Sequence, residues 1–135
     1  MKNWLVYGFI FWITATSSLF GADTTRIQLW NRLQQSPPSL SNSQLLCSLA
    51  EEISLLDPIL SNEIIQSLID QPSVKENDGL FGKCLLIKAS NLAAANQPEQ
   101  AEKILKEALR KFETANDTTG QLKALSQLGD IQMKQ

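Results

Sequence analysis

The stretch from residue 84 to residue 129 constrains the fold of this chain more than any other segment. Its small residues recur at helical spacing, and a proline-marked turn separates the first from the other two: Ala89, Ala101 and Ala108. Small side chains allow paired helices to approach closely, whereas larger ones hold them apart. The stretch therefore predicts a helical hairpin, and the pair Leu128-Gly129 indicates the start of a further hairpin.

The segments before this stretch also carry apolar residues three or four positions apart, which is the period of an α-helix. Between residues 23 and 72 this period predicts three helices: one that carries Trp30, one that follows a cap at Asn42 or Ser43, and one beyond Asp57-Pro58. The residue before a proline disfavours the helical conformation, so Asp57-Pro58 either ends the preceding helix or kinks it. No segment shows sustained alternation of apolar and polar residues, and the predicted class is all-α.

The polar segment of residues 73–79 is the best candidate for an internal boundary. Three further helices are expected beyond it, over residues 80–95 and 98–115 and from residue 119 onward. We therefore expect an N-terminal helical region at residues 23–72 and a second helical region at residues 80–135.

The N-terminal segment, residues 1–22, has the order of regions found in secretory signal peptides. Lys2 supplies positive charge, residues 4–13 form an apolar run, and small residues follow. An apolar run of this length falls short of the ~20 residues that a membrane-spanning helix needs. The sequence therefore predicts an exported protein, periplasmic or secreted, with residues 1–22 as its signal peptide. An uncleaved signal anchor, holding the protein on a membrane and facing outside the cytoplasm, is the alternative. Cleavage is compatible with three positions, after Ser17, Gly21 or Ala22.

The absence of histidine narrows the chemistry open to this chain. Histidine is the commonest general base and the commonest metal ligand near neutral pH, and the sequence has none. Charges of both signs are mixed along a chain of formal net charge −2, so there is no basic stripe for nucleic acid. We predict no catalytic residue, no metal site, no cofactor and no nucleic-acid partner, and membrane contact only through an uncleaved leader.

Residues 85–132 resemble the tetratricopeptide repeat (TPR) family, whose repeats are helix–turn–helix units. The residues that match the family pattern are Leu85, Ala89, Leu92, Ala101 and Ala108, with Leu105 in place of the usual aromatic residue, and Leu125, Leu128 and Gly129 restart the pattern. The return from Ala89 to Gly129 takes 40 residues instead of the ~34 of the family. The resemblance covers about one and a half repeats. It implies that these nine residues pack helices, and that antiparallel hairpins stack as a short solenoid with residues 23–72 as a degenerate repeat.

The same resemblance implies a non-enzymatic protein–protein interaction module or assembly scaffold. Its partner would be a protein or peptide, contacted by polar residues on the inner helix face: Lys88, Asn91, Gln127 and Asp130. An ordinary solvated surface is the other interpretation of these four residues. The leucines of the C-terminal helix also make a homodimer plausible. The alternative function is a small secreted all-α effector, or an envelope structural protein, whose helices form a closed bundle around Trp30.

The two cysteines, Cys47 and Cys84, stand 37 positions apart and form no metal-binding motif. In an exported protein such a pair can form a disulfide, which here would join the two helical regions. Two separate buried cysteines, packing as small apolar residues, are the alternative.

Overall fold

The structure is a computed structural model that describes residues 22–36 and 39–135. Residues 1–21, which hold nearly all of the predicted signal peptide, lie outside the described residues. The described residues form seven α-helices and no strand, which confirms the all-α class. By its contacts the chain divides into two compact units, residues 1–37 and residues 38–135.

The first unit contains one described helix, α2 (Ala22–Gln35). The side chain of Trp30 is only 7% exposed, whereas Ile27 on the same helix is 46% exposed. Beyond the end of α2 the Ser36 hydroxyl donates a hydrogen bond to the Arg32 carbonyl oxygen, which satisfies one of the last carbonyl groups of the helix. The predicted helix around Trp30 is therefore present.

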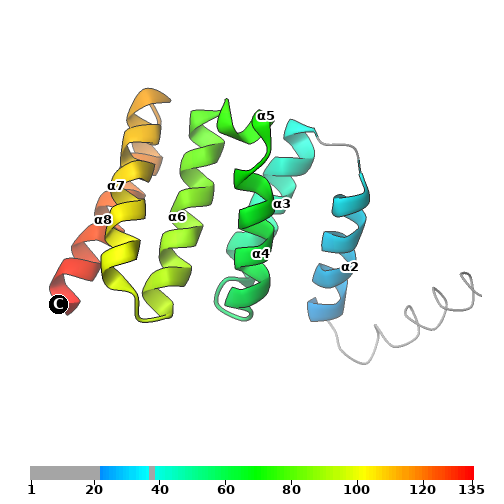
Figure 1. Cartoon of the computed structure of the whole chain (residues 1–135), viewed down its shortest axis with the longest axis horizontal. Coiled ribbons are helices and arrows are strands. Elements are labelled where there is room, and N and C mark those ends of the chain that lie inside the picture. Colours follow the sequence, from blue (N-terminus) through cyan, green and yellow to red (C-terminus); the bar gives the residue numbers. More distant parts are fainter. Residues whose placement is uncertain (1–21, 37–38) are drawn as a thin grey trace, which may run out of the picture. The chain divides into compact units, whose positions relative to one another are not determined.

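The second unit contains the other six helices (Figure 1). Their bounds are α3 (Leu40–Ile53), α4 (Pro58–Ile69), α5 (Pro72–Lys75), α6 (Asp78–Ala94), α7 (Pro98–Thr114) and α8 (Thr118–Lys134). The pairs α3/α4, α6/α7 and α7/α8 pack together across short loops, and α6 also contacts α3, α4 and α8. Helix α6 is therefore the central element of this unit.

Side chains cap four of these helices at the N-terminus, where backbone N–H groups lack partners. The caps are Ser39, Asp57, Asn77 and Asp117, each accepting from the N–H three residues later. The first of them corrects the expectation that Asn42 or Ser43 caps α3. Because Ser39 caps this helix, α3 begins at Leu40, two residues earlier than Asn42.

The polar segment 73–79 is not a boundary between compact units. Most of its first half forms the single-turn helix α5, which packs against α3, α4 and α6. Val74 is fully buried there. This one apolar residue among polar neighbours holds the segment against the rest of the second unit. The boundary between the two compact units lies between residues 37 and 38 instead.

Helices α6, α7 and α8 each contain 17 residues and begin at equal intervals along the chain. The two loops between them have the same conformation, because Asn96 and Asn116 both adopt positive φ, at 59° and 54°. In each loop the next residue donates its N–H to a carbonyl five residues earlier, Gln97 to Leu92 and Asp117 to Phe112, both at 2.9 Å. This is the Schellman arrangement that ends many helices. Asparagine tolerates the left-handed conformation better than most residues, and it sets both turns.

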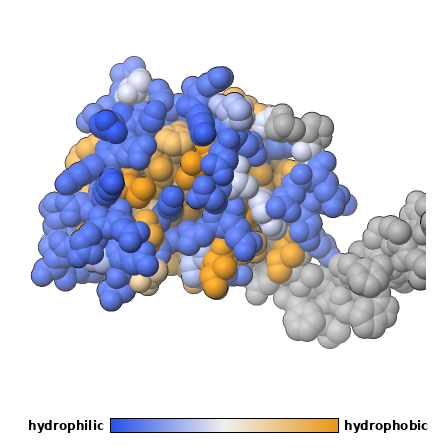
Figure 2. All heavy atoms as spheres, viewed as in Figure 1, coloured by the Kyte–Doolittle hydropathy of each residue, from blue (hydrophilic) through white to orange (hydrophobic). Residues whose placement is uncertain are grey.

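The main core of the second unit lies where α6, α7 and α8 meet. Ala89, Ala101, Leu105, Ala108, Phe112 and Ala124 are fully buried in it. Figure 2 shows apolar side chains on the face over α6 and α7, with hydrophilic side chains around them. Within residues 22–36 and 39–135, no helix is both long and apolar enough to span a membrane.

Candidate functional site

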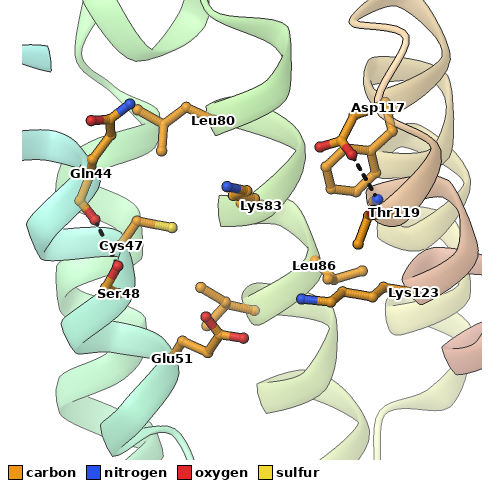
Figure 3. A pocket seen from close by; sticks show the side chains of 13 residues that line it. Gln44, Cys47, Ser48, Glu51, Leu80, Lys83, Leu86, Asp117, Thr119 and Lys123 are labelled. Atoms are coloured by element: carbon orange, nitrogen blue, oxygen red, sulfur yellow. Dashed lines mark hydrogen bonds between the residues drawn. The ribbon is translucent and has the colours of Figure 1, made fainter.

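A groove of about 340 Å³ runs across α6 between α3 and α8 (Figure 3). The buried part of its lining is mainly apolar: Cys47, Leu80, Leu86, Ile87, Phe112 and Gly120. The exposed part is polar: Gln44, Ser48, Glu51, Lys83, Thr119 and Lys123. A concave apolar surface with a few polar groups around it is the usual form of a ligand site in proteins.

The charged groups of the groove come from α3, α6, α8 and the cap residue before α8. Lys83 on α6 and Lys123 on α8 are both exposed, and neither forms an ion pair within the described part of the chain. Asp117 is already engaged, because its carboxylate accepts a hydrogen bond from the Gly120 N–H at 3.0 Å. Two ammonium groups and the carboxylate of Glu51 therefore remain to contact a ligand.

The apolar depth of the groove depends on Phe112, which is fully buried at the C-terminal end of α7. Its ring lies against Gly82 of α6, where an added Cβ would stand 2.9 Å from Cε1. The ring lies still closer to Gly120 of α8, so that an added Cβ there would overlap it. The two glycines let one aromatic ring of α7 contact both α6 and α8, an arrangement that sequence reasoning missed. A glycine before and a glycine after the helix that carries Phe112, at Gly82 and Gly120, was the signal in the sequence that could have indicated this contact.

The residues expected to pack the repeat divide into two groups. Seven of them lie in or against the core: Leu85, Ala89, Leu92, Ala101, Leu105, Ala108 and Leu128. The structure differs at the other two. Leu125 is 52% exposed, and a Cβ added to Gly129 would meet no atom within 4 Å. Both residues lie on a face of α8 that no other described helix covers.

The four residues expected to contact a partner do not lie together in the groove. Asn91 is 3% exposed, and its amide donates to Ser61 Oγ and Asn62 Oδ1, both at 3.0 Å. The Ser61 hydroxyl in turn donates to the Ala50 carbonyl oxygen at 2.9 Å. This network joins α3, α4 and α6, so Asn91 has a structural role and its assignment as a partner-binding residue is corrected.

The other three residues are more accessible but lie away from the groove lining. Lys88 borders a separate shallow depression between α4 and α6, beside Glu63 and Gln66. Gln127 is half-buried and accepts a hydrogen bond from the Ser90 hydroxyl at 3.2 Å, linking α8 to α6. Asp130 is exposed. None of the three lines the groove between α3 and α8.

On α6, the expected partner-binding residues lie on a different side of the helix from the residues that line the groove. The residues of α6 that line the groove include Leu80, Lys83 and Ile87, three and four positions apart, whereas Lys88 and Asn91 lie on the adjacent side facing α4. A helix that is apolar on most sides is enclosed on most sides. Lys83 is an exposed charge on such a helix, and this was the signal that could have marked the groove.

The two cysteines are brought together by the contact between α3 and α6. Both are free thiols and both are buried, Cys47 at 4% and Cys84 at 0% exposure. Hydrogen bonding from the Cys84 thiol lowers the pKa of Cys47, against the opposing effects of burial and of Glu51, while Lys83 lowers it further. The same hydrogen bond, together with burial, raises the pKa of Cys84.

The chain matches no protein-family model, no curated protein and no solved structure. Within residues 22–36 and 39–135, no three His, Cys, Asp or Glu side chains gather closely enough to hold a metal ion. The groove and the thiol pair are therefore interpreted from their own geometry.

Proposed function

We propose that this chain is a non-enzymatic, TPR-like protein-interaction module that binds an extended segment of a partner protein. The observation that carries the proposal is the groove between α3 and α8. It combines a buried apolar floor with two lysines at its exposed edge, Lys83 and Lys123, that have no ion-pair partner among the described residues. Such a surface suits a polypeptide segment, because apolar side chains enter the floor while polar groups fix register.

The repeat character of the fold is part of this proposal. Three helices of equal length follow one another at equal spacing, with the same asparagine turn between them. The return from Ala89 to Gly129 therefore spans two helix–loop units. Alternate helices α3, α6 and α8 supply most of the groove lining, as expected when hairpins stack side by side.

The charges of the groove favour a segment that carries carboxylates beside apolar side chains. The lining holds two ammonium groups and two carboxylates, but Asp117 is half-buried and accepts from the Gly120 N–H, so Lys83 and Lys123 are more accessible than that carboxylate. Complementary charges orient an incoming partner. Selection from a random peptide library on residues 23–135 would test this. We expect enrichment of Asp or Glu next to Leu, Ile or Phe.

The decisive variant is the double substitution Lys83→Glu with Lys123→Glu, which reverses the charge of the groove edge. We expect about a tenfold or greater loss of affinity for the selected peptides, which corresponds to ~1.4 kcal/mol or more. Lys103→Glu is the matched control, because Lys103 is an exposed lysine on α7 outside the groove. Equal loss in both variants, or no loss in either, would exclude the groove as the binding site.

Export is the second part of the proposal and rests on the order of regions in residues 1–22. Expression of the full chain in a bacterium, with separation of cytoplasm, periplasm and medium, tests it. The intact mass of the exported form then identifies cleavage after Ser17, Gly21 or Ala22. A full-length product in the membrane fraction would support the anchored alternative, and a full-length product in the cytoplasm would overturn export.

Self-association is a further proposed activity, favoured by one face of α8. This α8 surface consists of Leu122, Leu125, Gly129 and Met133, and its three large residues are 68%, 52% and 82% exposed. Three residues of this surface, Leu122, Leu125 and Gly129, have counterparts 40 residues earlier on α6. These counterparts are Gly82, Leu85 and Ala89. Gly82 contacts Phe112 of α7, and Leu85 and Ala89 belong to the core that α7 shares.

The proposed occupant of the α8 surface is α8 of a second copy. A two-fold axis places the same surface on both sides of the interface, so a single apolar face is sufficient. Sedimentation should show a concentration-dependent dimer that Leu125→Glu abolishes. Leu55→Glu is the control, because Leu55 is 93% exposed in the turn after α3. A wild-type protein that stays monomeric throughout would contradict this proposal and leave the groove proposal standing.

The alternative function remains an exported all-α effector or envelope structural protein with a closed bundle. This alternative requires that Trp30 packs in a closed core with the other helices. A Trp30→Ala variant that loses the helical signal of the whole chain would support the closed bundle. Unchanged peptide binding by the same variant would support the groove.

A further inference from the structure

Cys47 and Cys84 form the only pair of thiols in the chain, and packing brings them together from positions 37 residues apart. Cys47 lies on α3, Cys84 lies on α6, and these two helices contact each other. The Cys47 side chain is directed from α3 toward α6 in Figure 3, and each of the two thiols shifts the pKa of the other. Disulfide formation requires two cysteine side chains that approach each other closely, and these two buried thiols lie on contacting helices.

The two thiols differ in access to solvent. Cys47 contributes to the lining of the groove, and Figure 3 shows its sulfur directed from α3 toward α6. Cys84 does not line the groove and is fully buried. A reagent that enters the groove therefore reaches Cys47 first, and it reaches Cys84 only through Cys47.

We propose that Cys47 and Cys84 are an oxidisable pair that forms an intramolecular disulfide across α3 and α6, with Cys47 as the attacking thiol and Cys84 as the resolving thiol. The oxidant is a disulfide of small molecular size or of an oxidoreductase. The proposal does not depend on what the groove binds.

The reaction proceeds in two exchange steps. The Cys47 thiolate attacks one sulfur of the oxidant R–S–S–R, which forms a Cys47–S–S–R mixed disulfide and releases R–S⁻. Cys84 then loses its proton to water or to the released thiolate, and its sulfur attacks the sulfur of Cys47. The second R–S⁻ leaves. The protein has lost two electrons and two protons, and the oxidant has become two thiols.

The surroundings of Cys47 favour its assignment as the attacking thiol. The thiolate is the nucleophile in exchange, and neighbouring donors and cations stabilise it. The Cys84 thiol and the Lys83 ammonium group act in that direction, while the Glu51 carboxylate opposes them. Cys84 is disfavoured as the first nucleophile by its complete burial.

The disulfide would have a direct effect on the groove. In the reduced protein α3 and α6 are held by non-covalent packing. A bond between Cys47 and Cys84 would fix the α3 wall of the groove to the α6 floor. Oxidation would therefore hold the width of the groove at one value.

The test uses the folded wild-type protein and oxidised glutathione as the oxidant. After incubation and alkylation of remaining thiols, the intact mass should show the loss of two hydrogen atoms and no alkyl group. Peptide mapping should recover Cys47 linked to Cys84. Two alkylated cysteines after incubation, in protein whose circular dichroism is native, would overturn the proposal without any variant.

Two variants then test the order of events. In Cys84→Ser the reaction should stop at the first step, and the protein should carry one glutathione on Cys47. In Cys47→Ser the buried Cys84 should stay unmodified until denaturant is added. If Cys84 takes up glutathione in Cys47→Ser while Cys47 does not in Cys84→Ser, then Cys84 is the attacking thiol. If both single variants take up glutathione at equal rates, neither cysteine is the preferred attacking thiol. Peptide binding by the groove is measured separately, so failure of either proposal is recognised independently.

Discussion

The ring of Phe112 occupies the volume that a side chain at Gly120 would need. Phe112 is near the end of α7 and Gly120 is in the first turn of α8, so this contact closes the turn between the two helices. The Phe112 carbonyl oxygen also belongs to this turn, where it accepts from the Asp117 N–H at 2.9 Å. Position 120 is therefore restricted to glycine by a neighbour and not by its own backbone.

The substitution Gly120→Ala should destabilise the protein even though alanine favours helices. Alanine gains up to about 1 kcal/mol over glycine in a helix. Overpacking against a fully buried ring costs about 1–3 kcal/mol and should exceed that gain. Urea unfolding followed by circular dichroism measures the difference.

Gly129→Ala is the matched control on the same helix, because a Cβ there meets open space. Only the helix-propensity gain applies, and stability should rise by about 0.5–1 kcal/mol. If both variants shift stability in the same direction, the contact between Phe112 and Gly120 does not limit position 120.

Asn91→Ala should destabilise the protein by about 1–3 kcal/mol, because it removes two hydrogen bonds from a buried polar network. Lys88→Ala, on the same helix but half-exposed, should change stability by less than about 0.5 kcal/mol. Thermal unfolding of the two variants compares them directly. A larger loss for Lys88→Ala would mean that Asn91 does not hold α6 to α4.

Oxidation of the thiol pair should stabilise the protein. The disulfide would close a loop between positions 37 residues apart, and the chain-entropy account gives about 4 kcal/mol for such a loop, less any strain. The urea midpoint of the oxidised protein should exceed that of the reduced protein, and dithiothreitol should abolish the difference. Cys47→Ser should show one midpoint under both conditions.

Alkylation of Cys47 should depend on pH in a way that reports its contact with Cys84. Because hydrogen bonding from Cys84 lowers the pKa of Cys47, its thiolate forms at lower pH than it would without that partner. The rate of reaction with iodoacetamide should therefore rise at lower pH in wild type than in Cys84→Ala, which has no donor at position 84. An identical midpoint in the two proteins would show that the thiols do not interact.

The helices were predictable because the chain marks their ends with strong local signals. Prolines stand at the first position of α4 and α7, and polar caps precede α6 and α8. Helix α5 was missed because one turn gives no period, and its single apolar residue, Val74, resembles an isolated residue in a polar loop.

The groove was less predictable because it depends on which side of α6 faces each neighbour. That helix is apolar on most sides, so its sequence alone does not separate the side that faces α4 from the side that faces α3 and α8. The thiol pair, unlike the groove, was considered from the sequence. Disulfide bonding was considered from the number and compartment of the cysteines, but only the contact between α3 and α6 places the two side chains together.

The exposed side of α8 also bears on how the molecule opens. Helix α8 packs on α6 and α7 through one side, whereas α6 is enclosed by helices on several sides. The least enclosed element is expected to unfold locally before the rest, and its amide hydrogens should exchange first. Since α8 carries one wall of the groove, each such event would dismantle the groove while the hairpin of α6 and α7 stays folded. The lifetime of a bound segment would then be limited by the fraying of a single helix.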